Sequence, residues 1–134
     1  MNDKQYTIIL FRLPDNKLVL QRRTKDAPYG AGLLGIFGGH VEANETPDQC
    51  VLREIKEETN LNTDKLGLRS ITNFILPASK DFNKDRHFFL YEGNIDDDTF
   101  DVYEGDRAEA YTINELKNRD DLTGSARYTF DNIL

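Results

Sequence analysis

The sequence is short of cysteine and of long apolar runs, and both shortages limit what kind of protein it encodes. Among its 134 residues is a single cysteine, Cys50, so no disulfide can form within the chain. The apolar run near the start, residues 8–11, is too short for a signal-peptide core or a membrane span. We therefore expect a cytoplasmic protein with no membrane partner.

Positive charge is also scarce. The chain has 17 Lys and Arg residues against 24 Asp and Glu residues, which gives a formal net charge of −7. Non-specific binding to nucleic acid relies on a dense basic surface, so we expect no nucleic-acid polymer as a partner. A small phosphate-bearing ligand is not excluded, because a bound divalent cation can reverse the local electrostatic field.

The composition is that of an ordinary globular domain, with 38% hydrophobic and 31% charged residues. We find no internal repeat, low-complexity tract or interdomain linker, and a chain of this length is large enough to bury a core. Residues 1–134 are therefore expected to form a single domain.

Strands and helices are expected to alternate along the chain. Runs rich in β-branched and aromatic residues predict strands at residues 6–11, 17–23, 66–75, 87–91 and 108–113, the first two joined by a turn at Asp15-Asn16. The glycine-rich stretch 24–39 and the acidic stretch 93–106 are expected to be mainly loops. Short helical segments are expected at 114–117 and 126–134. This alternation favours an α/β or α+β class with a mixed sheet.

A longer helix has clear start and stop signals. Thr46 is a suitable N-cap, Pro47 fits the first helical position, and Gln49 completes a capping box. Asn60 is suited to the left-handed residue that ends such a helix. The apolar stripe of this helix is supplied by Cys50, Val51, Ile55 and the flanking Leu61.

Three glutamates lie on one face of this helix. Glu54, Glu57 and Glu58 are related by i, i+3 and i+4 spacing, and like charges so placed repel by roughly 0.2–0.5 kcal/mol per pair. Arg53 can offset part of this repulsion through an i, i+4 pair with Glu57. By itself the pattern fits a solvated acidic surface or a site for a hard cation such as Mg²⁺ or Mn²⁺, which prefer oxygen ligands.

The residues before the helix favour the cation site. Gly38 and Gly39 allow close approach of the backbone to a ligand, and Glu45 follows six residues after Gly39. The whole stretch resembles the box of the Nudix family, G-x5-E-x7-R-E-U-x-E-E-x-G-U, where U is a bulky aliphatic residue. The matching positions are Gly39, Glu45, Arg53, Glu54, Ile55, Glu57, Glu58 and Leu61, and Asn60 stands where the pattern has glycine.

The resemblance implies a fold and an activity. It implies one Nudix hydrolase domain over residues 1–134, built as an α/β/α sandwich with a central mixed sheet. It also implies Mg²⁺-dependent hydrolysis, with Mn²⁺ as a substitute, of a diphosphate bond in a nucleoside diphosphate-linked small molecule such as a modified nucleoside triphosphate. A homodimer is also compatible with the family.

Several alternatives stay open within this family. They are a nucleotide-sugar pyrophosphatase, an ADP-ribose pyrophosphatase and a catalytically silent module that senses nucleotides. An isopentenyl-diphosphate isomerase would call for a cysteine in the glycine-rich lead-in, and residues 24–45 contain none.

The box also implies roles for individual residues. Glu54, Glu57, Glu58 and the main-chain carbonyl of Gly39 resemble the metal ligands, and Glu57 or Glu58 is a candidate general base. Arg53 is similar to the arginine that orients the glutamates, with Glu45 as its partner. In the absence of metal we expect mutual repulsion to raise the pKa values of these carboxyl groups.

Further candidates lie outside the helix. Glu104 is an alternative general base, and Glu109 lies in the same region of the sequence. Gly38, Arg22 and Arg23 are candidate substrate-binding residues, although strand alternation lets at most one of the two arginines face a cleft. Four aromatic residues can either stack on a base or pack in the core, namely Tyr29, Phe37, Phe74 and Phe82. We expect His40 and His87 to be structural or surface residues and Cys50 to be buried.

Overall fold

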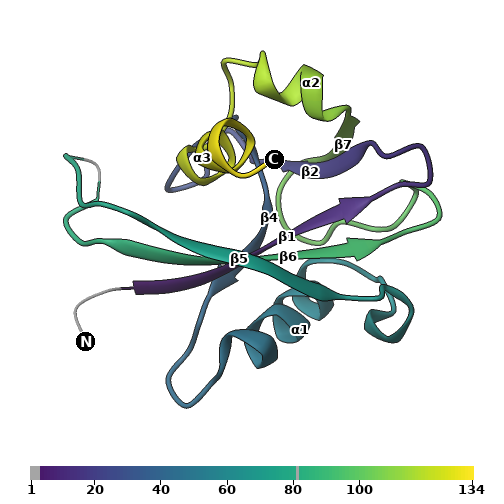
Figure 1. Cartoon of the computed structure of the whole chain (residues 1–134), viewed down its shortest axis with the longest axis horizontal. Coiled ribbons are helices and arrows are strands. Elements are labelled where there is room, and N and C mark those ends of the chain that lie inside the picture. The colour runs from purple at the N-terminus through teal and green to yellow at the C-terminus, as the bar shows by residue number, and fades with distance from the viewer. Residues whose placement is uncertain (1–3, 81) are drawn as a thin grey trace.

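Seven strands form one sheet, and helices cover both of its faces (Figure 1). The computed structural model describes residues 4–80 and 82–134. The strands are β1 (Lys4–Arg12), β2 (Leu18–Arg22), β3 (Leu34–Gly35), β4 (Phe37–His40), β5 (Arg69–Leu76), β6 (Arg86–Asn94) and β7 (Arg107–Tyr111). The helices are α1 (Pro47–Glu58), the 3-10 turn η1 (Thr63–Lys65), α2 (Ile113–Lys117) and α3 (Gly124–Asn132).

Strand β1 organises the sheet. It pairs in parallel with β6 along its whole length, from Lys4↔Arg86 to Arg12↔Asn94. Its other edge is shared by two antiparallel partners, β4 along the first half and β2 at the end. The remaining pairs, β2 with β3, β2 with β7 and β5 with β6, are also antiparallel. The sheet is therefore mixed, as predicted.

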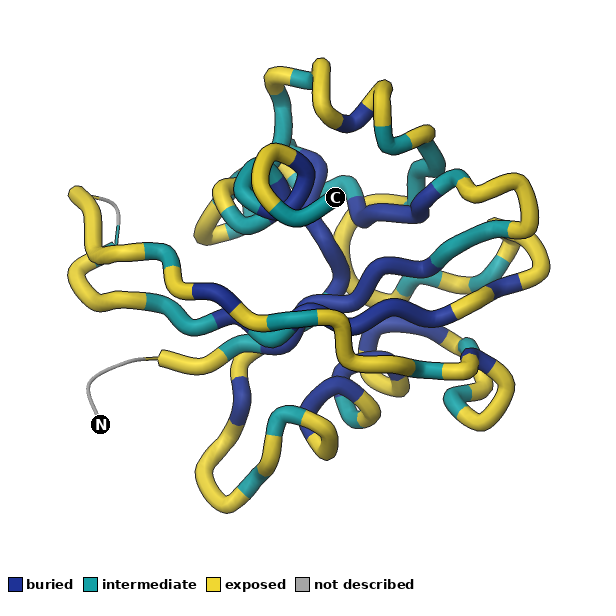
Figure 2. The backbone as a smooth tube through the Cα atoms, viewed as in Figure 1, coloured by how far each residue is buried: buried dark blue, intermediate teal, exposed yellow. Residues whose placement is uncertain are grey.

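The side chains of β1 alternate between two hydrophobic clusters. Ile8 and Leu10 point to the cluster that includes residues of α2 and α3, whereas Ile9 and Phe11 point to the cluster beneath α1. Figure 2 shows the buried residues concentrated along these central strands and on the inward sides of the helices. The α/β/α sandwich expected from the sequence is confirmed.

Helix α1 begins as its sequence predicts. The Thr46 side chain accepts a hydrogen bond from the Gln49 amide at 3.1 Å, and the Gln49 side chain accepts one from the Thr46 amide at 2.9 Å. Cys50, Val51 and Ile55 are buried against the sheet. Glu54 and Glu58 are buried on the same side of the helix, so this packing also fixes where their side chains lie.

The end of α1 differs from the prediction, because Asn60 is not left-handed. The non-glycine residues with positive φ in the described part of the chain are Asn16 and Asn44. Instead Thr59 caps the helix in an extended conformation and forms an antiparallel bridge with Val102. Asn60 then accepts a hydrogen bond from the Asp101 amide at 2.8 Å. The chain leaves the helix extended because it pairs with this loop.

The other differences concern element boundaries. The strand predicted from residue 66 begins at Arg69, because η1 and the turn after it come first. The glycine-rich stretch contains the short strands β3 and β4, and the last helix begins at Gly124. No helix in residues 4–80 and 82–134 is long and apolar enough to cross a membrane.

Candidate active site

The two glycines of β4 are held in close contact with their neighbours for different reasons. A Cβ atom on Gly38 would lie 1.9 Å from the main-chain oxygen of Thr7 on β1. A Cβ atom on Gly39 would lie 2.2 Å from Oε1 of Glu54. The carboxylate of Glu54 therefore packs directly on the β4 backbone, in space that only glycine leaves open.

Arg53 is the cation that holds the acidic residues together. Its Nε and Nη2 atoms donate to the two carboxylate oxygens of Glu45 at 2.7 and 3.0 Å. Its Nη1 atom donates to Glu54 at 2.9 Å and to Glu57 at 3.1 Å. Nη2 also donates to the main-chain oxygen of His40 at 3.0 Å. One guanidinium thus joins the α1 carboxylates to the loop before the helix and to the end of β4.

Glu58 is turned away from Arg53 and into the protein. It is buried and accepts a hydrogen bond from the Gly38 amide at 3.0 Å. Burial, followed by repulsion from Glu54 and Glu104, raises the pKa of Glu58 to about 9. Burial also raises the pKa of Glu54, although Arg53 opposes this shift. The predicted direction is confirmed for Glu54 and Glu58, but the larger cause is burial and not repulsion. For Glu45 the prediction is wrong, because its hydrogen bonds with Arg53 lower its pKa to about 2.

The donor set of this region suits a hard divalent cation. Three carboxylates and the carbonyl of Gly39 are oxygen ligands of the kind that Mg²⁺ prefers. In the described residues, no three Asp, Glu, His or Cys side chains are yet gathered as a ready metal site. The reason is visible in the contacts, since Arg53 engages Glu54 and Glu57 while Glu58 bonds to the Gly38 amide.

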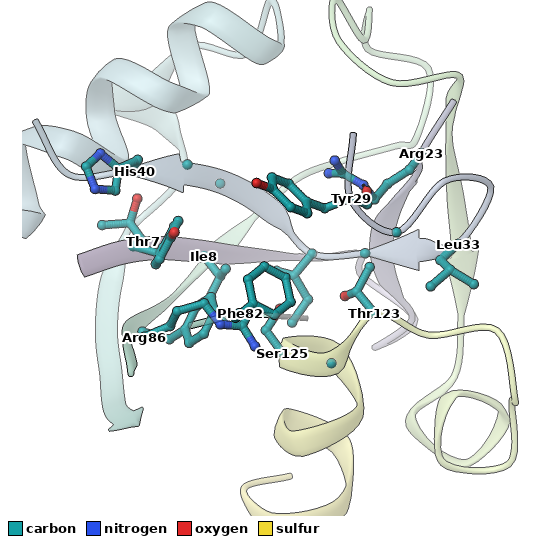
Figure 3. Close-up of a pocket in the computed structure, with 18 of the residues that line it drawn as sticks. Thr7, Ile8, Arg23, Tyr29, Leu33, His40, Phe82, Arg86, Thr123 and Ser125 are labelled. Carbon is teal, nitrogen blue, oxygen red and sulfur yellow. Dashed lines mark hydrogen bonds between the residues drawn. The ribbon is translucent and has the colours of Figure 1, made fainter. Parts of the chain in front are cut away.

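A cavity of about 810 Å³ opens beside Gly38 and Gly39 (Figure 3). It lies between β4, the loop after β2, the loop before β6 and the start of α3. Its described lining includes Arg23, Arg86 and His40 but no Asp or Glu residue. In a chain with a net charge of −7, this separation of charge places an anion-compatible cavity next to the carboxylate face of α1.

The structure separates the two candidate arginines. Arg22 donates to Glu109 at 2.7 and 2.9 Å and to Asp121 at 2.9 Å, and it does not line the cavity. Arg23 lines the cavity, and its Nε donates to the main-chain oxygen of Tyr29 at 2.7 Å. The prediction that Arg22 binds substrate has no structural support, because two carboxylates already occupy its guanidinium.

The two acidic candidates outside α1 are also distinguished. Glu109 is paired with Arg22 and Arg107, and these contacts lower its pKa to about 2. The Glu104 side chain is exposed and close enough to Glu54 and Glu58 to raise the pKa values of both. Of the two, Glu104 is the one that lies near the α1 carboxylates.

The aromatic candidates divide between core and cavity. Phe37 and Phe74 are buried in the two hydrophobic clusters. Tyr29 and Phe82 line the cavity, with ring centroids 5.3 Å apart, and Tyr29 is 62% exposed. Cys50 is buried, as predicted, within 3.2 Å of the Thr7 hydroxyl.

The two histidines were expected to be structural or surface residues, and their surroundings differ. His87 is hydrogen-bonded to Asn73 near the surface of the sheet. His40 is exposed at the rim of the cavity and stacks edge-on with Tyr6.

Some cavity residues were missed by the sequence reasoning. Arg86, Thr123 and Ser125 come from β6 and α3, far along the chain from the glycine-rich stretch. No local motif marks them, because their proximity arises only when β6 pairs with β1 and α3 packs on the same face of the sheet. The nearest signal is the polar turn before β6, which brings Arg86 to a strand end.

This arrangement, an acidic helix face next to a glycine strand and a cationic cavity, is typical of α/β proteins that bind phosphate compounds through a divalent cation. Comparison with known proteins specifies the class further. The chain belongs to the Nudix family, since the family model described as NUDIX domain matches residues 3–133.

Individual relatives match over shorter segments. The 8-oxo-dGTP diphosphatase of Escherichia coli (strain K12) is 31% identical over 91 residues, which cover 68% of this chain and 64% of that protein. The ADP-ribose pyrophosphatase of Methanocaldococcus jannaschii is 49% identical over 47 residues, 35% of this chain and 27% of that protein. The chain thus matches less than two thirds of the length of these curated relatives.

A solved structure matches over nearly the whole chain. The MutT protein from Methanosarcina mazei Go1 has a TM-score of 0.79 and 20% identity, with 96% of this chain and 90% of that chain covered. At this level of identity the likeness establishes the fold.

Proposed function

We propose that this protein hydrolyses a diphosphate bond in a nucleoside diphosphate-linked small molecule, with Mg²⁺ as cofactor and Mn²⁺ as a substitute. One observation carries the proposal. The glutamate face of α1 meets, at Gly38 and Gly39, a cavity whose described lining contains arginines and no carboxylate. Phosphate groups are favoured at this junction, because cationic side chains lie on one side and cation-binding oxygens on the other.

The residues of α1 would hold the metal. Glu54, Glu57, Glu58 and the carbonyl of Gly39 are the proposed ligands, and a divalent cation bound there would neutralise charge that develops on the phosphate oxygens. Arg53 positions Glu54 and Glu57 through the hydrogen bonds described above. Glu45 in turn fixes the orientation of the Arg53 guanidinium by a two-point contact.

Glu57 is the proposed general base. Its side chain is 51% exposed, so its carboxylate reaches water, whereas the Glu58 carboxylate is buried against the Gly38 amide. Glu104, on the loop that pairs with the end of α1, is the alternative. Arg23 would bind the phosphate groups of the substrate from the cavity side, and Gly38, which has no side chain, would let them approach the β4 backbone.

A nucleoside triphosphate, modified or unmodified, is the proposed substrate. Support comes from the relative named 8-oxo-dGTP diphosphatase, which matches the larger share of this chain. A nucleotide sugar or ADP-ribose is the alternative, and the relative named ADP-ribose pyrophosphatase supports the latter. Presence of all four box glutamates favours catalysis over a silent sensing module. The homodimer and the cytoplasmic location stay predictions.

The test is release of phosphate or pyrophosphate from a panel of nucleoside triphosphates, nucleotide sugars, ADP-ribose and dinucleoside polyphosphates. Each compound is assayed with Mg²⁺, with Mn²⁺ and with chelator. We expect turnover that requires metal and falls about 100-fold or more in Glu57→Gln, since loss of a general base has an effect of that order. A 100-fold fall in Glu104→Gln, with Glu57→Gln active, would move the role of base to the loop.

Glu115→Gln is a matched control. Glu115 lies outside the site and completes the capping box of α2, a role that glutamine also fulfils. It removes one carboxylate and should leave turnover unchanged. Metal-dependent binding of one compound without any turnover would instead support the sensing module.

A further inference from the structure

Gln21 is a buried polar side chain outside the residues proposed for catalysis. It lies on β2 and is only 5% exposed. Strand alternation places it with Val19 on the face of the sheet beneath α1, whereas Leu18 and Leu20 point to the other face. Its cross-strand neighbour on β7, Ala108, is apolar, and a buried amide is costly unless it is hydrogen-bonded. The partner of Gln21 therefore indicates why a polar residue stands here.

That partner is the turn that carries Glu104. The side-chain nitrogen of Gln21 donates to the main-chain oxygen of Glu104 at 2.6 Å. The next residue, Gly105, has a left-handed φ of 81°, and a Cβ atom on it would lie 2.8 Å from the same nitrogen. The Asp106 amide then donates to the main-chain oxygen of Arg22 at 2.8 Å. Strand β2 thus fixes the backbone of this turn.

The preceding part of the loop is fixed by the core and by α1. The Phe100 ring packs near Phe11 and Phe37, with ring centroids 5.7 and 6.1 Å away. The Tyr103 amide donates to the main-chain oxygen of Glu58 at 2.7 Å. Surface loops are generally more mobile than the elements they connect, whereas this loop is attached to α1 just before the turn and to β2 at the turn.

The side chain of Glu104 takes no part in holding the loop. It is exposed, and within residues 4–80 and 82–134 its carboxylate makes no hydrogen bond or ion pair. It lies close enough to Glu54 and Glu58 to interact with both, and the interaction of like charges is unfavourable. The contacts of Gln21 thus hold one carboxylate beside two others at a cost in stability, which a bound cation would reverse.

We infer that Gln21 is a positioning residue of this site, because it holds the Glu104 carboxylate where its charge adds to that of the α1 carboxylates and strengthens the binding of a divalent cation. The inference rests on the metal site of the proposed function. Gln21 itself touches neither metal nor substrate and acts through Glu104.

The experiment measures the affinity for Mn²⁺ by calorimetry, without nucleotide, in wild type and in Gln21→Met. Methionine keeps the length of the side chain and removes the donor. We expect Mn²⁺ to bind roughly 3- to 10-fold more weakly in Gln21→Met and in Glu104→Gln, as loss of one nearby charge at a partly exposed site implies. A double variant with both changes should lose no more affinity than Glu104→Gln alone, because the two residues act as one unit.

Gly105→Ala disturbs the same contact from the loop side and gives an answer even if Gln21→Met is poorly folded. Its Cβ atom would displace the Gln21 amide, so the affinity for Mn²⁺ should fall by a similar factor. Gly67→Ala is the control, because Gly67 also has a left-handed φ, of 57°. Its Cβ position lies 3.9 Å from the side-chain nitrogen of Asn94, so this variant should bind Mn²⁺ as wild type does.

Thr129→Val is the matched control for Gln21→Met. Thr129 is also buried, and its hydroxyl donates to the main-chain oxygen of Ser125 at 2.8 Å. It lies on α3 and does not line the cavity. Its loss should lower the melting temperature about as much as Gln21→Met does and leave the affinity for Mn²⁺ unchanged. The pair therefore separates lost stability from lost positioning.

Three results would overturn the inference while leaving the proposed hydrolysis intact. They are wild-type affinity for Mn²⁺ in Gln21→Met, wild-type affinity in Glu104→Gln, and a double variant whose loss is the product of the two single losses. Absence of turnover with every compound of the substrate panel would refute the proposed hydrolysis, and binding of Mn²⁺ alone would still decide the inference. If wild type binds no Mn²⁺, the inference fails together with the proposed metal site.

Discussion

At the scale of single residues, Gly38 and Gly39 show how two adjacent glycines meet different demands. The Gly38 position is closed by the backbone of β1, which cannot move without separating the strands. The Gly39 position is closed by the end of the Glu54 side chain, which can rotate. The first glycine is therefore required by the fold and the second by the placement of a carboxylate.

Substitution of each glycine by alanine should affect stability at Gly38 and activity at Gly39. In Gly38→Ala the new Cβ would meet the Thr7 oxygen at 1.9 Å, and we expect destabilisation of about 3 kcal/mol or more in urea unfolding. In Gly39→Ala the Glu54 carboxylate must move, so we expect a nearly unchanged unfolding midpoint but activity at least 10-fold lower, measured across a Mg²⁺ titration. Full activity of Gly39→Ala at the wild-type Mg²⁺ requirement would contradict the role given to Glu54.

At the scale of elements, the end of α1 and the loop after β6 hold each other in place. The Asn60 side-chain oxygen accepts a hydrogen bond from the Asp101 main-chain amide. The Asn60 side-chain nitrogen donates to the Asp101 carboxylate at 3.3 Å. Next to it, the Tyr103 amide donates to the main-chain oxygen of Glu58 at 2.7 Å. The loop that carries Glu104 is thus positioned by the residue that replaces the glycine of the family pattern.

Restoring that glycine should loosen the loop. Asn60→Gly removes both contacts with Asp101 and adds backbone freedom, so we expect a loss of about 1 kcal/mol in the free energy of unfolding. Hydrogen exchange at the Asp101 amide should become faster, which mass spectrometry or NMR can measure. Unchanged exchange would indicate that the Thr59–Val102 bridge alone positions the loop.

At the scale of the whole molecule, one ion cluster joins segments that are distant in the sequence. Arg22 on β2 contacts Glu109 on β7 and Asp121 just before α3. The Glu109 side chain is only 11% exposed, and its hydrogen bond to Arg22 is the main reason that its pKa is lowered to about 2. Hydrogen bonds from Arg119 and, to a lesser extent, from Arg22 lower the pKa of Asp121. The cluster therefore ties the sheet edge to the C-terminal helix only while its carboxylates are ionised.

Acid should weaken the fold through this cluster. The carboxyl of Glu109 has an ordinary pKa of about 4.3 in an unfolded chain, so its contribution is complete above that pH and is lost as the pH falls toward 2. The contribution is on the order of 2 kcal/mol. We expect the difference in unfolding free energy between wild type and Glu109→Gln to shrink between pH 7 and pH 3 in urea titrations. A difference that does not change with pH would show that Glu109 stabilises the fold without its charge.

Much of the chemistry could be predicted from local sequence, because it depends on residues close together in the chain. The capping box of α1, the one-sided placement of Glu54, Glu57 and Glu58, and the glycines before them follow from helical spacing and short-range turns. The β-branched and aromatic residues at 6–11 likewise indicated a strand, and the interleaved elements indicated the fold class. These features are set by backbone geometry over a few residues.

The tertiary structure alone decided which residues face the site. It paired Arg22 with Glu109 and Asp121 and left Arg23 to the cavity. It brought Arg86 against Phe82, whose ring also contacts Tyr29, and it directed the chain after α1 toward Val102 in place of a left-handed turn. Each outcome depends on contacts between segments far apart in the chain, and local spacing does not specify such contacts. The sequence by itself determined the carboxylate helix, whereas packing of distant strands determined the cavity beside it.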